Sequence, residues 1–170
     1  METFSEDSLR RGHRLAVLIG WAMILSVLAY AGVVEFLSRS NAPFAGYSPL
    51  PADVFNTLRL VLLGVCLIDY AIIPFLRNRV LLARNQPGRP SVGNLPAPVA
   101  RLLSASVITF AFCESIAIYG LVLFLLNAAR QEFYLFLCLS LLAFVIHFPR
   151  HERWQEWARN MGNAIRSEFK

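Results

Sequence analysis

A single acid lies near the middle of the most apolar stretch of the chain. Residues are apolar from Leu102 to Leu126 except for a few small hydroxyls, one Cys, one Gly and Glu114. A carboxylate at the centre of a bilayer costs at least about 2.5 kcal/mol, and acids placed there usually have a function. Because burial favours the neutral form of a carboxyl group, the chemistry that Glu114 offers is binding and release of a proton.

A second acid, Asp69, interrupts another apolar run. At the rise of a helix, Glu114 lies about 18 Å and Asp69 about 10 Å from the cytoplasmic ends that we predict for their runs. Consecutive spans are antiparallel, so the two carboxyls could face each other across a depth offset of about 8 Å, with a water or a shared proton between them. Neighbouring hydroxyls complete the predicted ion-binding set, which is Glu114, Asp69, Tyr119 and Ser115.

A structural interpretation competes with this one. A neutral acid can join helices through hydrogen bonds without exchanging any ion. For Glu114 the candidate partners lie on its own or adjacent turns, at Ser104, Thr109, Ser115 and Tyr119. Asp69 has a further alternative, because it could reach toward the cytoplasmic interface and pair with Arg77 or Arg79.

The composition predicts an all-α membrane protein. Of the 170 residues, 56% are hydrophobic and 16% charged, whereas soluble domains carry roughly 25% charged residues. Four apolar runs, at about 15–37, 58–76, 102–127 and 133–148, predict a four-helix transmembrane bundle over residues 1–149. The first run is longer than a signal-peptide core, although a cleaved signal remains the competing interpretation. Pro74 should kink or loosen the last turn of the second span.

The basic residues predict how the chain is oriented. Thirteen of the 16 Lys and Arg residues fall in the N-terminal tail, the 77–101 loop and the C-terminal tail, which an even number of spans places on one side. Short basic segments stay in the cytoplasm. We therefore expect both termini in the cytoplasm, with a bacterial inner membrane as the setting. Residues 150–170 alternate charges with apolar residues three or four apart, which predicts an amphipathic helix on the membrane surface or against a partner.

Several classes of function have no support in the sequence. The charge placement argues against a nucleic-acid partner, and no pattern of an enzyme active site is present. The three cysteines all lie inside apolar runs and have no ligand spacing, so neither a metal site nor a cofactor is predicted.

One segment resembles a known family. Residues 114–122 read ESIAIYGLV, and Arg84-Asn85-Gln86-Pro87 lies in the basic loop before them. Over residues 84–126 the chain resembles the proteolipid (subunit c) of rotary ATP synthases, in which a mid-helix acid carries the ion. The resemblance implies that Glu114 is that carboxylate and that Arg84, Gln86 and Pro87 form a partner-docking loop.

The resemblance covers about a quarter of the chain. The second run has only Gly64 where the family has a glycine-repeat face, and no internal repeat is present. The whole chain looks like one of the small bacterial four-span proteins that carry such a segment. We expect an integral membrane protein with a proton- or cation-binding carboxylate at Glu114. The alternative is a non-transporting structural or assembly component of a membrane complex. Under either function, the predicted partners of the protein are the lipid bilayer and either further copies of the chain or other membrane subunits.

Overall fold

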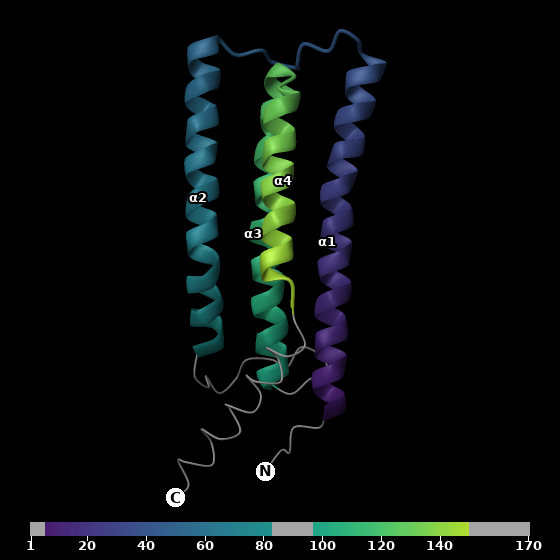
Figure 1. The fold of residues 1–170 in the computed structure, drawn as a ribbon, viewed down its shortest axis with the longest axis vertical. Helices are drawn as coiled ribbons and strands as arrows, with labels where there is room; N and C mark the ends of the chain where they lie inside the picture. The colour runs from purple at the N-terminus through teal and green to yellow at the C-terminus, as the bar shows by residue number, and fades with distance from the viewer. Residues whose placement is uncertain (1–5, 83–96, 150–170) are drawn as a thin grey trace, which may run out of the picture.

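The computed structural model describes residues 6–82 and 97–149, and within these ranges its regular secondary structure is all helical (Figure 1). The elements follow one another as α1 (Glu6–Ser40), α2 (Ala52–Leu82), α3 (Ala97–Asn127) and α4 (Arg130–His147). They run alternately up and down, and all four are long and apolar enough to cross a membrane. The prediction of an all-α membrane protein with a four-helix bundle is confirmed.

The helices extend beyond the predicted apolar spans. α1 starts at Glu6 and α2 continues to Leu82, because a helical backbone does not need apolar side chains once it has left the hydrocarbon. Pro74 lies inside α2, so the expectation that it sits in the last turn of that helix is wrong. A proline in a membrane helix removes one backbone donor, and the surrounding structure tolerates the loss.

α3 is the central element, because each of the other three helices packs against it. α1 and α2 lie on either side of the α3–α4 pair (Figure 1). α3 and α4 form a tight hairpin, in whose turn Ala128 adopts a positive φ of 54° and donates its backbone N–H to Phe124 O at 2.8 Å. Gly120 lets the two helices approach closely, since a Cβ at this position would lie 2.7 Å from Phe136 Cβ.

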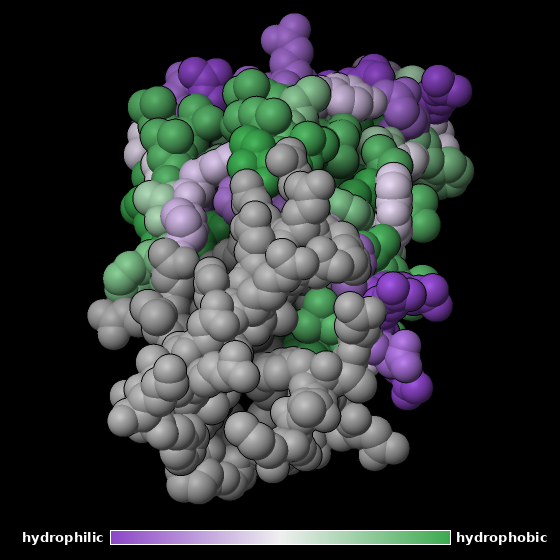
Figure 2. Space-filling model, turned by 60° about the horizontal axis from the view of Figure 1, so that its bottom comes forward, coloured by the Kyte–Doolittle hydropathy of each residue, from purple (hydrophilic) through white to green (hydrophobic). Residues whose placement is uncertain are grey.

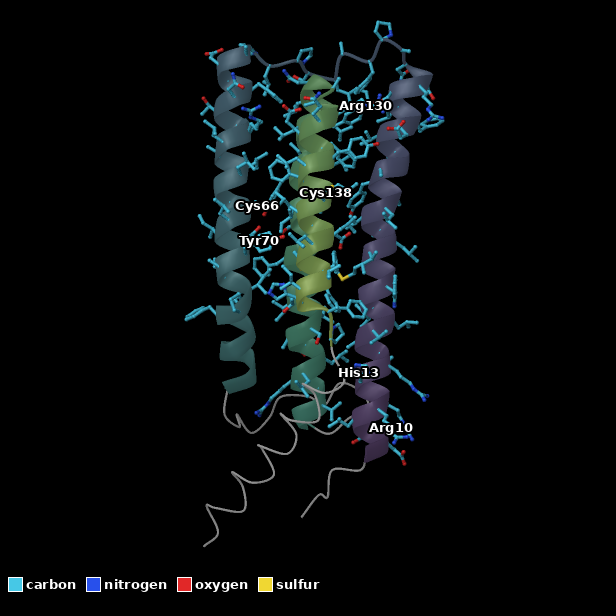
Figure 3. The ribbon with its side chains drawn as sticks, viewed as in Figure 1. Arg10, His13, Cys66, Tyr70, Arg130 and Cys138 are labelled. Atoms are coloured by element: carbon cyan, nitrogen blue, oxygen red, sulfur yellow. The ribbon has the colours of Figure 1, made fainter. Side chains whose placement is uncertain are left out.

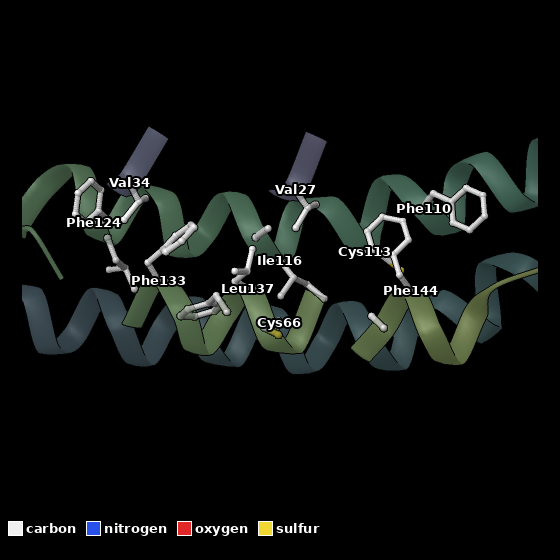
Figure 4. Close-up of a cluster of buried hydrophobic side chains, with 14 of the residues drawn as sticks. Val27, Val34, Cys66, Phe110, Cys113, Ile116, Phe124, Phe133, Leu137 and Phe144 are labelled. Carbon is white, nitrogen blue, oxygen red and sulfur yellow. The ribbon is translucent and has the colours of Figure 1, made fainter. Parts of the chain in front are cut away.

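The core is built mainly from aromatic side chains of α3 and α4 (Figure 4). Phe110 stacks on Phe144 with ring centroids 5.7 Å apart, and Phe124 contacts Phe133 at 6.4 Å. α1 adds Val27 and Val34, both fully buried. α2 contributes little to this core, with Cys66 and Ile73 as its buried apolar side chains.

Large apolar side chains also cover the outside of the bundle. Leu67 on α2 is 72% exposed, and Leu18 and Leu25 on α1 are comparably open. Figure 2 shows green, apolar side chains over much of the described surface and purple, polar ones at the far rim and at the lower right. An exposed apolar surface of this extent is what a bilayer would cover, and the four apolar helices suggest a multi-pass membrane protein.

Polar contacts close the end of the bundle that carries the α3–α4 turn. The side-chain amide of Asn127 makes two hydrogen bonds to the backbone of Leu50. Its Oδ1 accepts from Leu50 N at 2.9 Å, and its Nδ2 donates to Leu50 O at 3.1 Å. Arg59 of α2 pairs with Glu132 of α4 at 3.4 Å. We call this end the turn end, and the opposite one, where α1 begins and α4 finishes, the termini end.

Two sequence predictions fall outside the residues that the structure describes. One is the partner-docking loop with Arg84, Gln86 and Pro87, and the other is the amphipathic helix over residues 150–170. The suggested pairing of Asp69 with Arg77 or Arg79 involves side chains that are likewise outside the description. These expectations stay predictions.

Candidate functional site

Glu114 is held by two hydroxyls of the neighbouring helix α1. Ser26 Oγ and Tyr30 Oη each donate to Glu114 Oε1 at 2.7 Å. The two hydroxyls also lie 3.2 Å from each other, so the three oxygens form a closed triangle. The side chain of Glu114 is half-buried at the α1–α3 interface.

Asp69 of α2 is held in a similar way by α3. Tyr119 Oη donates to Asp69 Oδ2 at 2.9 Å. Ser115 Oγ lies 3.5 Å from the same oxygen and also donates to Phe112 O at 2.8 Å, so Tyr119 is the stronger partner. Asp69 is only 6% exposed, which makes it the more deeply buried acid of the two.

The two carboxyls are held by the same sequence pattern. Ser26 and Tyr30 are four residues apart on α1, and Ser115 and Tyr119 are four apart on α3. Residues at this spacing lie one above the other on a helix face. The hydroxyls of a Ser and a Tyr can therefore both hydrogen-bond to one side chain of the neighbouring helix. We call the Ser26–Tyr30 pair the first clamp and the Ser115–Tyr119 pair the second clamp.

The two acids do not face each other, and the sequence prediction is wrong here. Consecutive residues are 100° apart around a helix, so Glu114 points from α3 toward α1 while Ser115 points toward α2. The predicted depth offset of about 8 Å is also wrong, because Asp69 contacts the residue next to Glu114. The offset was counted from the ends of the apolar runs, at Leu76 and Leu102, whereas α2 runs to Leu82 and α3 begins at Ala97, so those run ends do not mark a common depth.

The polar layer continues into α4. Tyr70, which follows Asp69 in the chain, donates its hydroxyl to Leu139 O. Ser140, which follows Leu139, donates to Cys113 O at 2.6 Å. Hydrogen bonds at one level therefore join α1 to α3, α3 to α2, and α4 to both α2 and α3.

No family model matches this chain, and comparisons with curated proteins and with solved structures find no match. Its chemistry is therefore argued from the geometry of the two clamps.

Of the two groups of residues around the acids, the sequence predicted only the one around Asp69. Asp69, Tyr119 and Ser115 come together as predicted, whereas Glu114 binds Ser26 and Tyr30, which were missed. The suggested partners Ser104 and Thr109 instead donate to carbonyls of their own helix, at Ala100 O and Ala105 O. The signal that would have identified the first clamp is the shared Ser-x-x-x-Tyr spacing in an apolar run.

The hydroxyls around Glu114 act as hydrogen-bond donors to it. Among the described residues, no three or more His, Cys, Asp or Glu side chains gather as they would around a metal ion. Both hydroxyls of the first clamp donate toward Glu114 Oε1. The carboxyl is thus surrounded by hydrogen-bond donors, and a cation would require these hydroxyls to turn their lone pairs inward.

Proposed function

We propose that this protein is an integral membrane protein that binds and releases a proton at Glu114. The observation that carries the proposal is the first clamp: a half-buried carboxyl, deep in a membrane-spanning helix, receives two hydroxyl hydrogen bonds on a single oxygen. The resemblance of residues 84–126 to the rotor proteolipid supports the same residue.

The first clamp brings the two protonation states of Glu114 closer in energy. Ionised, the carboxylate costs at least about 2.5 kcal/mol in the bilayer centre, and hydrogen bonds to a charged group return about 1.5–3 kcal/mol each. Neutral, the acid keeps Oε1 as an acceptor for both hydroxyls while Oε2 carries the proton. A site that accommodates both states can exchange its proton, and one that accommodates a single state cannot.

Burial separates the roles of the two acids. Asp69 is 6% exposed, and Tyr119 donates to it at 2.9 Å in the interior of the bundle. Glu114 is more open, at the edge of the α1–α3 interface. We therefore assign proton exchange to Glu114 and give Asp69 the role of attaching α2 to α3 through its hydrogen bonds.

The test is labelling with dicyclohexylcarbodiimide, which modifies protonated carboxyls in apolar surroundings. We expect Glu114 to be modified in membranes, and less so as the pH rises, because only the protonated acid reacts. Glu114→Gln should abolish the labelling. Asp69→Asn is the matched control, since it removes the other intramembrane acid and should leave labelling of Glu114 in place. Unmodified Glu114 in the folded protein would overturn the proposal.

A structural or assembly role is the second candidate. The observation in its favour is that the polar layer joins all four helices, as expected of groups that only fix helix pairing. Under this alternative, Glu114→Gln would keep the clamp through its amide oxygen, the protein would function normally, and Glu114 would not react with the carbodiimide.

The charge distribution supports an orientation with both termini in the cytoplasm of a bacterium. α1 begins and α4 ends at the same end of the bundle, where the ring of His13 lies 3.2 Å from Pro149 O. The three segments that carry most of the basic residues belong to this end, and such segments remain on the cytoplasmic side.

A further inference from the structure

We propose that the outer face of α1 binds an anionic phospholipid at the termini end. Arginines at the start of the helix contact the lipid phosphate, and exposed apolar side chains of the same helix face contact its acyl chains. Binding of this lipid does not depend on the proton site at Glu114, which lies on the opposite side of α1. Three properties of α1 support the proposal: the direction of these side chains, their depth and their charge.

One face of α1 packs against α3 and α4. Ala16, Val27 and Val34 are fully buried. Because successive residues turn by about 100° around a helix, these three lie within about 20° of one another. Gly20 belongs to the same face, where a Cβ would lie 3.0 Å from Phe110 Cζ. The opposite face of α1 is therefore turned away from the described helices.

That opposite face carries a stripe of exposed apolar side chains. Leu18 is 68% exposed, Trp21 57% and Leu25 63%. The ring of Trp21 also contacts Phe148 edge-on, with centroids 5.9 Å apart, so it lies against the bundle while most of it stays open. Lipid acyl chains are what would cover such a stripe in a bilayer. We call these three residues the outer stripe.

Arg11 and Arg14 continue the outer stripe toward the termini end. At about 100° per residue, both fall within the same arc of about 80° as the three apolar residues, and both are exposed. Arg10, also exposed, lies at the edge of this arc. Among the described residues, neither Arg11 nor Arg14 makes an ion pair. Guanidinium groups thus come directly before apolar side chains, in the order in which a phospholipid presents its phosphate and its acyl chains.

The depth of these arginines fits the phosphate level of a bilayer. Arg14 and Arg39 are 25 residues apart, which is about 37.5 Å along the helix axis. The hydrocarbon core is about 30 Å thick, and the bilayer with its headgroups about 40–45 Å. Both arginines therefore reach a headgroup layer when α1 crosses the membrane. Arg11 lies one turn further out, so its long side chain and that of Arg14 can approach one phosphate.

The charges on α1 indicate which end prefers an anionic lipid. At the turn end, Arg39 lies on the same face but pairs with Glu35 at 3.6 Å. At the termini end, Asp7 is the acid that shares the arc with Arg11 and Arg14, so the described side chains there keep a net positive charge. A zwitterionic phospholipid neutralises its phosphate with its own cation. The excess positive charge therefore favours a phospholipid that lacks one.

Trp21 can report which lipid lies against the outer stripe. The chain has three tryptophans, so Trp154→Phe and Trp157→Phe leave Trp21 as the sole indole. The full-length protein is placed in phosphatidylcholine vesicles that contain a small fraction of either brominated phosphatidylglycerol or brominated phosphatidylcholine, because bromine on an acyl chain quenches indole fluorescence on contact. We expect the anionic lipid to quench Trp21 well beyond its share of the bilayer, and the zwitterionic lipid in proportion to its share. Equal quenching by the two lipids overturns the proposal.

Charge variants then locate the headgroup. Arg11→Gln and Arg14→Gln should each lower the preference for phosphatidylglycerol by about fivefold, which is the loss expected for one basic residue near a membrane surface. Asp7→Asn should raise the preference, because it removes an acid from the same arc.

Arg39→Gln is the matched control, because it removes an exposed arginine from the same face of α1 at the turn end. Its quenching ratio should equal that of the parent protein. A preference that survives both Arg11→Gln and Arg14→Gln, or that falls equally in Arg39→Gln, contradicts the site. Carbodiimide labelling of Glu114 should be the same in all these variants, so the lipid site can fail while the proton site stands.

Discussion

At the scale of single residues, the structure shows how a carboxyl group is accommodated in the middle of an apolar bundle. Glu114 and Asp69 each receive hydroxyl hydrogen bonds from a Ser and a Tyr on the adjacent helix. Interhelical hydrogen bonds in membrane proteins contribute about 0.6 kcal/mol on average. Their contribution to stability is thus small, and their larger effect is on the charge state of the acid that they surround.

Replacing Tyr30 with Phe tests this effect. The change removes one of the two donors to Glu114 Oε1, and a donor favours the ionised form of the acid that it contacts. Tyr30→Phe should therefore let carbodiimide labelling of Glu114 persist to higher pH than in the parent protein.

The matched control is Tyr119→Phe, which removes the same hydroxyl from the second clamp. Its labelling midpoint at Glu114 should stay where it is in the parent protein. Equal midpoints in the parent and both variants would show that the first clamp does not influence the charge on Glu114.

The two acids could be recognised from sequence because each interrupts an apolar run, and that signal needs no knowledge of neighbours. Ser26 and Tyr30 could not be recognised in the same way, because a serine and a tyrosine inside an apolar run cost little and occur often. Which helix face meets which is decided by tertiary packing. The direction in which Glu114 points therefore required the structure.

At the scale of the helices, the hairpin of α3 and α4 provides the rigid part of the bundle. Gly120 faces the backbone of α4, and a Cβ there would lie 3.0 Å from Phe133 O as well as 2.7 Å from Phe136 Cβ. Gly64 of α2 has open space around it instead. A methyl group would clash with α4 at Gly120 and with nothing at Gly64, so Gly64 can serve as the control for a substitution at Gly120.

Gly120→Ala should destabilise the protein by about 1–3 kcal/mol, because backbone and Cβ atoms of α4 cannot move aside as a flexible side chain would. Gly64→Ala should be neutral or slightly stabilising, by up to about 1 kcal/mol. Reversible unfolding in mixed detergent micelles, followed by circular dichroism, measures both. Equal stabilities of the two variants would contradict the close packing of α3 on α4.

The four spans were predictable because a run of about 20 apolar residues has few alternatives in a membrane protein. Their ends were not, since α1 and α2 continue as helices through charged residues. This error had a consequence for the site: the depths of Asp69 and Glu114 were counted from run ends that are not the ends of α2 and α3. Element bounds, rather than element types, limited the prediction of the site.

At the scale of the whole molecule, polarity differs between the two ends of the bundle. The turn end carries three of the 16 basic residues, and there Arg130 and Arg39 pair with Glu35 while Arg59 pairs with Glu132. At the termini end, Arg10, Arg11 and Arg14 lie near the start of α1. Figure 3 shows Arg130 near one end of the bundle and Arg10 near the other.

The proposed orientation has a simple test in bacteria. A green fluorescent protein fused after Lys170 should be fluorescent, because it folds in the cytoplasm, whereas alkaline phosphatase at the same position should be inactive. A phosphatase inserted in the loop between α1 and α2 should be active. The opposite pattern would reverse the membrane orientation and place the turn end in the cytoplasm.

The central claim is that Glu114 carries an exchangeable proton inside the membrane, and infrared difference spectroscopy of the reconstituted protein tests it most directly. We expect a carbonyl stretch of a protonated carboxylic acid that shifts on transfer to deuterated water, disappears in Glu114→Gln and persists in Asp69→Asn. A spectrum in which Glu114→Gln removes no protonated-acid band, or removes one that never exchanges with deuterium, would contradict it.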